Sequence, residues 1–213
     1  MSIRSAVHPR TPQGFSGAVA PSLDPASPGG YYGRVMAKLI PPTLILPTIN
    51  LYAAFLDCRD EWGPGLHEDG FGLAAEDDVD TPEGFAAWIR ERTRLTHPAG
   101  TPCPAEKHGS PRWIVEDGQV LGGIALRHLH DDRFGHIGYG LRPSARGRGL
   151  ATWALGEMLL EARAVLDTDR VLIPCLADNL ASARTIERNG GVLEEIRETD
   201  HGPVRRYWIT LPR

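Results

Sequence analysis

The chain has 213 residues, of which 41% are hydrophobic and five are tryptophan, enough to build one domain with a substantial core. A net charge of −4 without any dense basic run excludes a nucleic-acid-binding surface, and the short, interrupted apolar runs exclude a membrane span. The three cysteines are widely spaced and form no CxxC pair, which excludes a disulfide framework and a zinc knuckle and favours a reducing cytoplasm.

The first segment, residues 1–35, is rich in Pro, Gly, Ser and Ala and has no apolar periodicity. Such a composition cannot bury enough apolar surface to order the chain. It also lacks the basic-then-apolar layout of a signal peptide. We therefore predict a disordered N-terminal extension over residues 1–35 and a single folded domain over residues 36–213.

The first half of the domain is expected to hold one short strand and two helices. Lys38–Ile40 is the expected strand. A helix capped by Thr48 is expected to run to about Arg59, because apolar residues recur there at helical spacing. The stretch Asp80–Glu83 combines a capping residue, an early proline and a glutamate, so it predicts the start of a second helix that ends near Leu95.

The second half is expected to be rich in strands. Asp117-Gly118 lies between two apolar runs and predicts a β-hairpin turn. The expected elements are strands Arg112–Glu116, Val120–Arg127 and Phe134–Arg142, helix Leu150–Leu166, strand Arg170–Cys175, helix Ala181–Asn189, and a closing hairpin of Val192–Arg197 and Val204–Leu211. An antiparallel meander followed by a strand–helix–strand crossover predicts an α/β fold with helices on both faces of the sheet.

The most informative stretch is the glycine-rich turn at residues 142–151, between an expected strand and an expected helix. Its core, Arg146-Gly-Arg-Gly-Leu-Ala151, fits the pattern Arg/Gln-x-x-Gly-x-Gly/Ala. The N–H groups at a helix entrance have no partner inside the helix, so with the helix dipole and the arginines they attract a polyanion such as a pyrophosphate. The turn is neither a Walker A loop, because no Gly-Lys-Ser/Thr follows, nor a Rossmann fingerprint, because Thr152 stands where the third glycine is due.

Two further patterns flank this turn. Gly138 and Gly140 alternate with larger residues in the strand that enters it, which indicates either an extended ligand along the strand or close packing of a helix above it. After the next strand, Asn179-Leu-Ala-Ser182 places an amide and a hydroxyl one helical turn apart. These two side chains are suited either to contacting a ligand or to capping the helix.

Together, the turn at 142–152, Asp178-Asn-x-x-Ser182 and the Asn189-Gly-Gly end resemble the GNAT superfamily of acyl-CoA-dependent N-acetyltransferases. The stretch His136-Ile-Gly-Tyr-Gly-Leu-Arg-Pro-Ser and the terminal Arg206-Tyr-Trp-Ile resemble a bacterial subgroup of predicted acetyltransferases. The resemblance covers about residues 36–213. It implies a mixed, mostly antiparallel central sheet with helices on both faces, and transfer of an acetyl group from acetyl-CoA to a primary amine by direct attack on the thioester.

The resemblance also implies roles for particular residues. The pyrophosphate of coenzyme A would lie on the backbone of the turn, and the pantetheine arm would pair with the preceding strand, which would separate from strand Arg170–Cys175. The implied cofactor-binding residues are Leu141, Arg142, Arg146, Gly147, Arg148, Gly149, Leu150, Ala151 and Asn179.

The proton-transfer groups depart from the family pattern. Many members carry a tyrosine acid seven residues after the asparagine, and Ile186 occupies that place here. Ser182 is the expected substitute, hydrogen-bonding the thiolate, with bulk water as the alternative. For the base we consider His136, since an imidazole titrates near pH 6.5; the alternatives are a purely structural His136, Glu116 as the base, and a water chain.

Other reactive side chains are expected to play no part in the chemistry. Cys175 ends a strand beside the expected thioester site but has no adjacent base, so we predict a small buried hydrophobe rather than an acyl-enzyme nucleophile. His128 and His130 share a strand face without an apparent third ligand, so we predict no metal. The acidic stretch Glu76–Asp80 would either attract a cationic amine or form a solvated loop.

These expectations describe a cytoplasmic acetyl-CoA-dependent acyltransferase. Its acceptor would be a small-molecule or peptide amine, with no nucleic-acid or membrane partner, and its oligomeric state is left open, a homodimer included. Because the usual tyrosine is absent, the alternative is a non-catalytic acyl-CoA-binding or sensor module.

Overall fold

The computed structural model describes residues 41–63, 65, 70–94, 109–131, 134–200 and 202–212. The extension predicted for residues 1–35 and the strand expected at Lys38–Ile40 lie outside the described residues. None of the helices in the described ranges is long and apolar enough to cross a membrane.

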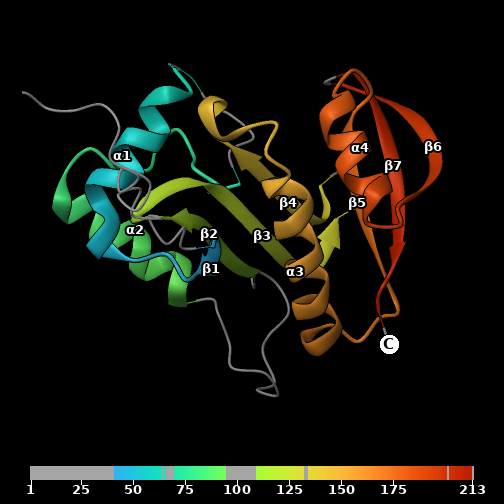
Figure 1. Ribbon diagram of the computed structural model, residues 1–213, viewed down its shortest axis with the longest axis horizontal. Coiled ribbons are helices and arrows are strands. Elements are labelled where there is room, and N and C mark those ends of the chain that lie inside the picture. The colour runs from blue at the N-terminus through green and yellow to red at the C-terminus, as the bar shows by residue number, and fades with distance from the viewer. Residues whose placement is uncertain are drawn as a thin grey trace, which may run out of the picture. The chain divides into compact units, whose positions relative to one another are not determined.

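Four strands form the first sheet, in the order β1-β2-β3-β4 with every neighbouring pair antiparallel (Figure 1). They are β1 (Thr43–Ile45), β2 (Gly109–Glu116), β3 (Gln119–Asp131) and β4 (Gly135–Leu141). The predicted hairpin is confirmed between β2 and β3, where Asp117 and Gly118 have φ values of 50° and 76°. Both lie in the left-handed region that a two-residue hairpin turn requires.

Three strands form a second antiparallel sheet, in the order β5-β7-β6. They are β5 (Arg170–Leu176), β6 (Val192–Thr199) and β7 (Gly202–Thr210). β4 and β5 lie next to each other but are not paired into one sheet. Near the start of β4, the His136 Nδ1 atom accepts a hydrogen bond of 2.9 Å from the backbone N–H of Leu172 in β5.

The helices begin and end within a few residues of their expected limits. They are α1 (Tyr52–Glu61), α2 (Pro82–Arg94), α3 (Leu150–Val165) and α4 (Leu180–Arg188), with short 3-10 turns at Ile49–Leu51 and Pro143–Ala145. Thr48 accepts a hydrogen bond from the Asn50 N–H, and Thr81 accepts one from the Gly84 N–H. Both threonines therefore supply the capping oxygen that satisfies an orphan donor of the first turn.

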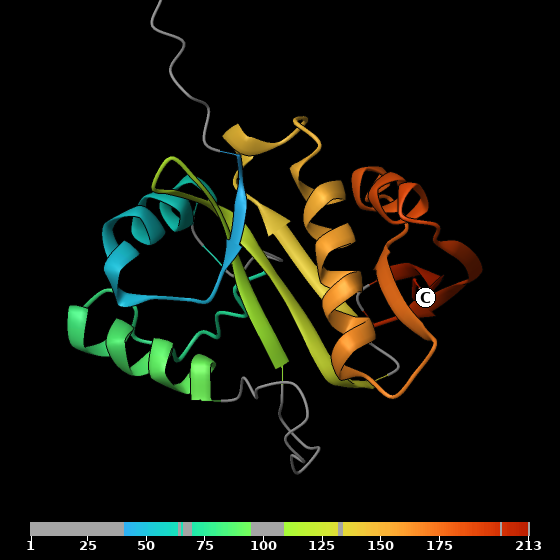
Figure 2. The same cartoon turned by 60° about the horizontal axis from the view of Figure 1, so that its bottom comes forward.

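Helices α1 and α2 lie on one face of the first sheet and α3 lies on the other (Figure 2), and the buried side chains divide into two clusters on these two faces. Trp113 and Ile114 are consecutive in β2 and belong to different clusters, as the alternation along a strand requires. The first cluster joins the sheet to α1 and α2 around Phe55, and the second joins it to α3, α4 and the β5–β7 sheet. The predicted α/β fold with helices on both faces is therefore confirmed.

Candidate active site

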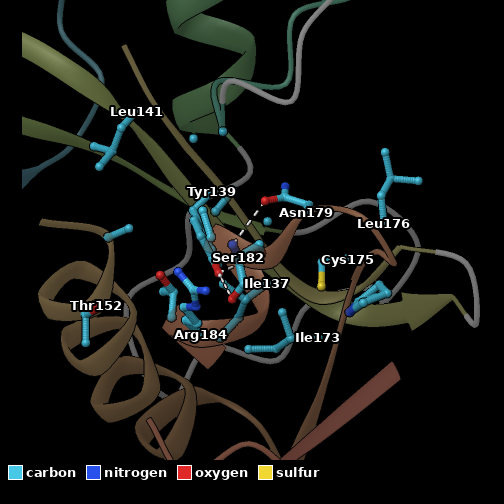
Figure 3. A pocket seen from close by; sticks show the side chains of 18 of the residues that line it. Ile137, Tyr139, Leu141, Thr152, Ile173, Cys175, Leu176, Asn179, Ser182 and Arg184 are labelled. Carbon is cyan, nitrogen blue, oxygen red and sulfur yellow. Dashed lines mark hydrogen bonds between the residues drawn. The ribbon is translucent and has the colours of Figure 1, made fainter. Parts of the chain in front are cut away.

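A cavity of about 880 Å³ is lined by β4, β5, α4 and the turn that leads into α3 (Figure 3). Its volume is in the range of small-molecule binding sites. Because β4 and β5 are edge strands of separate sheets, their facing backbone groups are not consumed by a shared ladder. The cavity therefore offers both side chains and strand edges to an extended ligand.

The glycine-rich turn forms one end of this cavity. Gly147 and Gly149 have φ values of 76° and 80°, and Gly149 caps α3. A Cβ atom at either glycine would meet nothing within 4 Å, so the left-handed backbone rather than crowding requires glycine here. The first bond of α3 runs from the Trp153 N–H to the Gly149 carbonyl (3.0 Å), so the N–H groups of residues 150–152 precede it.

The structure brings most of the predicted cofactor-binding residues together on the cavity wall. They are Leu141, Arg146, Gly147, Gly149, Leu150, Ala151 and Asn179. Arg142 and Arg148 are not among the lining residues. The Arg148 guanidinium donates to both carboxylate oxygens of Glu116, at 2.8 and 2.6 Å, which also engages the carboxylate considered as a base.

The Arg142 side chain connects the end of β4 to α1. Its guanidinium donates to Asp57 at 2.6 Å and to Glu61, and Glu61 also accepts from the hydroxyl of Ser144 at 2.8 Å and from its N–H. Partial burial alone would raise the pKa of Glu61, but the hydrogen bonds from Ser144 and Arg142 outweigh it and hold that pKa below its ordinary value. Arg142 therefore positions α1 and the turn through its side chain.

A pH-dependent contribution to stability follows from this network. A carboxylate whose folded-state pKa is lowered stabilises the fold fully above its ordinary pKa of about 4.5, and that contribution is lost as the pH falls through the lowered value. We expect Glu61→Gln to melt below the wild type at neutral pH, with the gap closing as the pH falls below the ordinary carboxyl pKa of about 4.5 and through the lowered value. Thermal unfolding followed by circular dichroism tests this, with Glu157→Gln on the exposed side of α3 as the control. A gap that does not change with pH would contradict it.

The charged side chains on the described part of the cavity wall are all arginines. They are Arg127 from β3, Arg146 from the turn, and Arg184 and Arg188 from α4, with no Asp, Glu, His or Lys among the described lining residues. Arg146 is held by a bond to the Leu141 carbonyl (3.0 Å) and lies over the Trp62 ring at 4.8 Å. The side chains of Arg184 and Arg188 have no hydrogen bond or ion pair within the described ranges. The wall is therefore suited to a ligand with several negative charges.

Ser182 and Asn179 lie together at the start of α4, beside β4 (Figure 3). The Asn179 Oδ1 atom accepts a hydrogen bond of 3.0 Å from the Ser182 N–H, so Asn179 caps the helix while it lines the cavity. The Ser182 hydroxyl lies 2.9 Å from the Tyr139 hydroxyl of β4. Tyr139 was not predicted, although its alternation with Gly138 and Gly140 placed it on the same strand face as Ile137 and Leu141.

His136 is not brought into the cavity. Its side chain is 6% exposed, its Nδ1 accepts the bond from Leu172, and its ring centroid lies 6.4 Å from that of Trp208. A lone pair engaged by a backbone N–H is not available to take a proton from a substrate. The geometry supports the structural alternative for His136, as a link between β4 and β5, and we do not retain it as the base.

The explanation of the strand glycines by a ligand beside the strand has support, whereas the close contact at Gly138 is with a side chain of β3 and not with a helix. Gly138 and Gly140 line the cavity. A Cβ atom on Gly138 would approach the Arg127 guanidinium to 3.0 Å, and one on Gly122 would approach the Gly140 carbonyl oxygen to 2.1 Å. The backbone at this point therefore borders the cavity on one side and packs closely against β3 on the other.

The remaining candidates keep structural contacts. In the acidic stretch, Asp77 accepts from the Trp88 indole (3.0 Å), and Asp80 pairs with Arg59 (2.6 Å). Neither carboxylate lines the cavity. Cys175 lines it without a described imidazole or carboxylate beside it on the wall. The described residues hold no group of three metal-ligating side chains; the side chain of His130 lies outside them.

Comparison with known proteins adds family evidence. A model of the acetyltransferase (GNAT) domain matches residues 59–192. The comparison with curated proteins gave no match.

Solved structures are similar in fold. The microcin C7 self-immunity acetyltransferase MccE, in complex with acetyl-CoA and AMP, is 17% identical with a TM-score of 0.55, over 79% of this chain and 92% of that one. A Salmonella typhimurium acetyltransferase that modifies the N-terminal serine of a 50S ribosomal subunit protein is 17% identical with a TM-score of 0.58, over 80% and 95%. RimJ from Mycobacterium smegmatis, in complex with CoA-disulfide, is 19% identical with a TM-score of 0.58, over 81% and 84%.

Proposed function

Because the chain belongs to the GNAT acetyltransferase family, we propose that it transfers an acetyl group from acetyl-CoA to a primary amine in the cytoplasm. The observation that carries this proposal is the cavity between β4 and β5. It ends on a glycine turn whose following N–H groups precede the first hydrogen bond of α3, and the charges on its described wall are all positive. Acetyl-CoA combines a pyrophosphate with an extended, uncharged arm, so its charge and shape fit this arrangement.

The cofactor would be held mainly by backbone groups. In the proposed pose the pyrophosphate accepts hydrogen bonds from the N–H groups at the start of α3, close to Arg146. Arg184 and Arg188 lie four residues apart on one face of α4 and would pair with further phosphate oxygens. The pantetheine arm would lie along β4, within reach of the side-chain nitrogen of Asn179. The Oδ1 atom of the same side chain already caps α4.

The chemistry would follow from this placement. The Arg142 N–H donates to the Leu121 carbonyl oxygen in β3 (2.9 Å). Because successive N–H groups of a strand point to opposite sides, the Leu141 N–H points away from β3. There it would polarise the thioester carbonyl. The neutral amine attacks that carbonyl carbon, the C–S bond breaks, and the sulfur leaves as a thiolate that accepts a hydrogen bond from Ser182. The described wall supplies no carboxylate or imidazole, so we propose that water takes the proton from the amine.

A thiol-release assay tests the proposed reaction. Acetyl-CoA is incubated with the protein and a panel of primary amines, including peptides with N-terminal serine, free amino acids, polyamines and aminonucleosides. We expect at least one amine to release thiol faster than hydrolysis alone and to gain the mass of one acetyl group. Calorimetry with coenzyme A is the companion measurement. Tight binding without thiol release on any amine would favour the acyl-CoA-binding module, and absence of binding would contradict both functions.

A further inference from the structure

The cavity contains a tyrosine hydroxyl that contacts Ser182, the proposed hydrogen-bond donor to the thiolate. The Tyr139 Oη atom lies 2.9 Å from Oγ and 3.3 Å from the backbone oxygen of Ser182 (Figure 3). Both residues line the cavity, one from β4 and the other from α4. The Ser182 N–H is bonded to Asn179, which fixes the first turn of α4 at this point.

The hydrogen bond between the two hydroxyls can run in either direction. If Tyr139 donates to the Ser182 backbone oxygen, the serine proton is directed at Tyr139 and is withheld from a ligand. If Tyr139 donates to the serine Oγ, the serine proton is released to point into the cavity. A thiolate in the cavity selects the second arrangement, because it accepts hydrogen bonds and donates none.

We propose that Tyr139 acts through Ser182 as a positioning and proton-relay residue, so that the pair supplies the proton which the coenzyme A thiolate takes up. This inference rests on the proposed function. When the C–S bond breaks, its electron pair stays on sulfur. The sulfur takes the proton of Ser182, the serine oxygen takes the proton of Tyr139, and the resulting phenolate regains a proton from water. The amine has meanwhile released one proton to water, so the protons balance.

The acidity of the groups explains why a serine alone is insufficient. Proton transfer is efficient when donor and acceptor have similar pKa values. An ordinary thiol has a pKa of about 8.5 and an ordinary phenol one of about 10. An alcohol is a far weaker acid, so Ser182 can stabilise a thiolate but cannot give up its proton unless it receives another. Tyr139, whose hydroxyl is in hydrogen-bond contact with that of Ser182, can supply one.

The pKa of the thiol of bound coenzyme A measures this coupling without any acceptor amine. It is followed by the ultraviolet absorbance of the thiolate, with S-methyl-coenzyme A subtracted as the blank. We expect the thiol pKa to be lowest in the wild type and to rise by about one unit or more in both Ser182→Ala and Tyr139→Phe. In the double variant the rise should match that of a single variant, because either loss breaks the same relay.

Controls separate this relay from general effects of the cavity. The wall arginines Arg127, Arg146, Arg184 and Arg188 also favour a thiolate, but they are the same in every variant. Tyr207→Phe removes a buried tyrosine hydroxyl that donates to Glu187 on α4 (2.9 Å) without lining the cavity, so it should keep the wild-type thiol pKa.

One kind of result would contradict the relay and another would contradict the proposed function, and the two can be distinguished. A wild-type thiol pKa in Tyr139→Phe, or strictly additive effects in the double variant, would overturn the relay. Failure of the wild type to bind coenzyme A would overturn the proposed function itself, and the relay with it.

Discussion

Replacing Gly149 with glutamate is expected to abolish measurable binding of coenzyme A while the protein stays folded. The residue caps α3 at φ 80°, at the point where the pyrophosphate would meet the helix N–H groups. A carboxylate there would face the phosphates at a few ångströms, and at about 4 Å two like charges cost about 4 kcal/mol at an effective dielectric constant of 20. That corresponds to a loss of affinity of more than about a hundredfold, which calorimetry measures directly.

The chain offers a matched control for the backbone strain in this variant. Gly118, in the turn between β2 and β3, has φ 76° and, like Gly149, has open space where a Cβ would be. Gly118→Glu should therefore lose the same stability, about 1–2 kcal/mol, from placing a side chain in the left-handed region. It should bind coenzyme A like the wild type, because Gly118 does not line the cavity. Wild-type affinity in Gly149→Glu would remove the turn from the cofactor site.

Replacing Phe55 with alanine is expected to have the largest effect on stability. Phe55 is completely buried, and its ring centroid lies 5.0, 5.3 and 5.4 Å from those of Phe85, Trp88 and Trp113. Truncating such a side chain removes its transfer free energy and leaves a cavity, so the free energy of unfolding should fall by about 3–5 kcal/mol. Equilibrium denaturation in urea measures this change.

The control for Phe55 is an apolar side chain that packs against little. Leu160 on α3 is 56% exposed, so Leu160→Ala should change the free energy of unfolding by less than about 0.5 kcal/mol. Phe55 also anchors α1. This helix carries Glu61, the partner of Arg142, and is followed by Trp62, whose ring lies under Arg146. A small change in Phe55→Ala would mean that the two helices are not held by the aromatic cluster.

The local elements of the fold could be predicted because their signals are local. Asp117-Gly118 required left-handed backbone angles, and Thr48 and Asn179 supplied capping oxygens, so the hairpin and two helix starts followed from a few residues each. The strand predicted at Lys38–Ile40 lies outside the described residues, and β1, which follows Pro41-Pro42 and pairs Thr43 with Val115, was not predicted. Its partner is more than sixty residues away, and a segment of three residues has too short a pattern to reveal it.

The candidate site was predictable where the backbone defines it and less so where side chains compete for partners. The turn from Arg146 to Ala151 lies on the cavity because its glycines and its helix entrance are features of the sequence itself. Three other predicted site residues are engaged by partners that only the tertiary structure brings near. Arg142 pairs with Glu61, Arg148 pairs with Glu116, and His136 accepts a hydrogen bond from Leu172. Tyr139 was overlooked for the same reason, since its contact with Ser182 joins a strand to a helix 43 residues later.

The separation of β4 from β5 also bears on how the protein avoids aggregation. An edge strand presents unpaired N–H and C=O groups, and these recruit strands from other molecules. In the described sheets the edges are β1, β4, β5 and β6, and β4 and β5 are turned towards each other across the cavity. A β-strand of a second molecule would have to enter that interior space to pair with either edge. The gap that admits a ligand thus also keeps two of the four edges from templating intermolecular sheets.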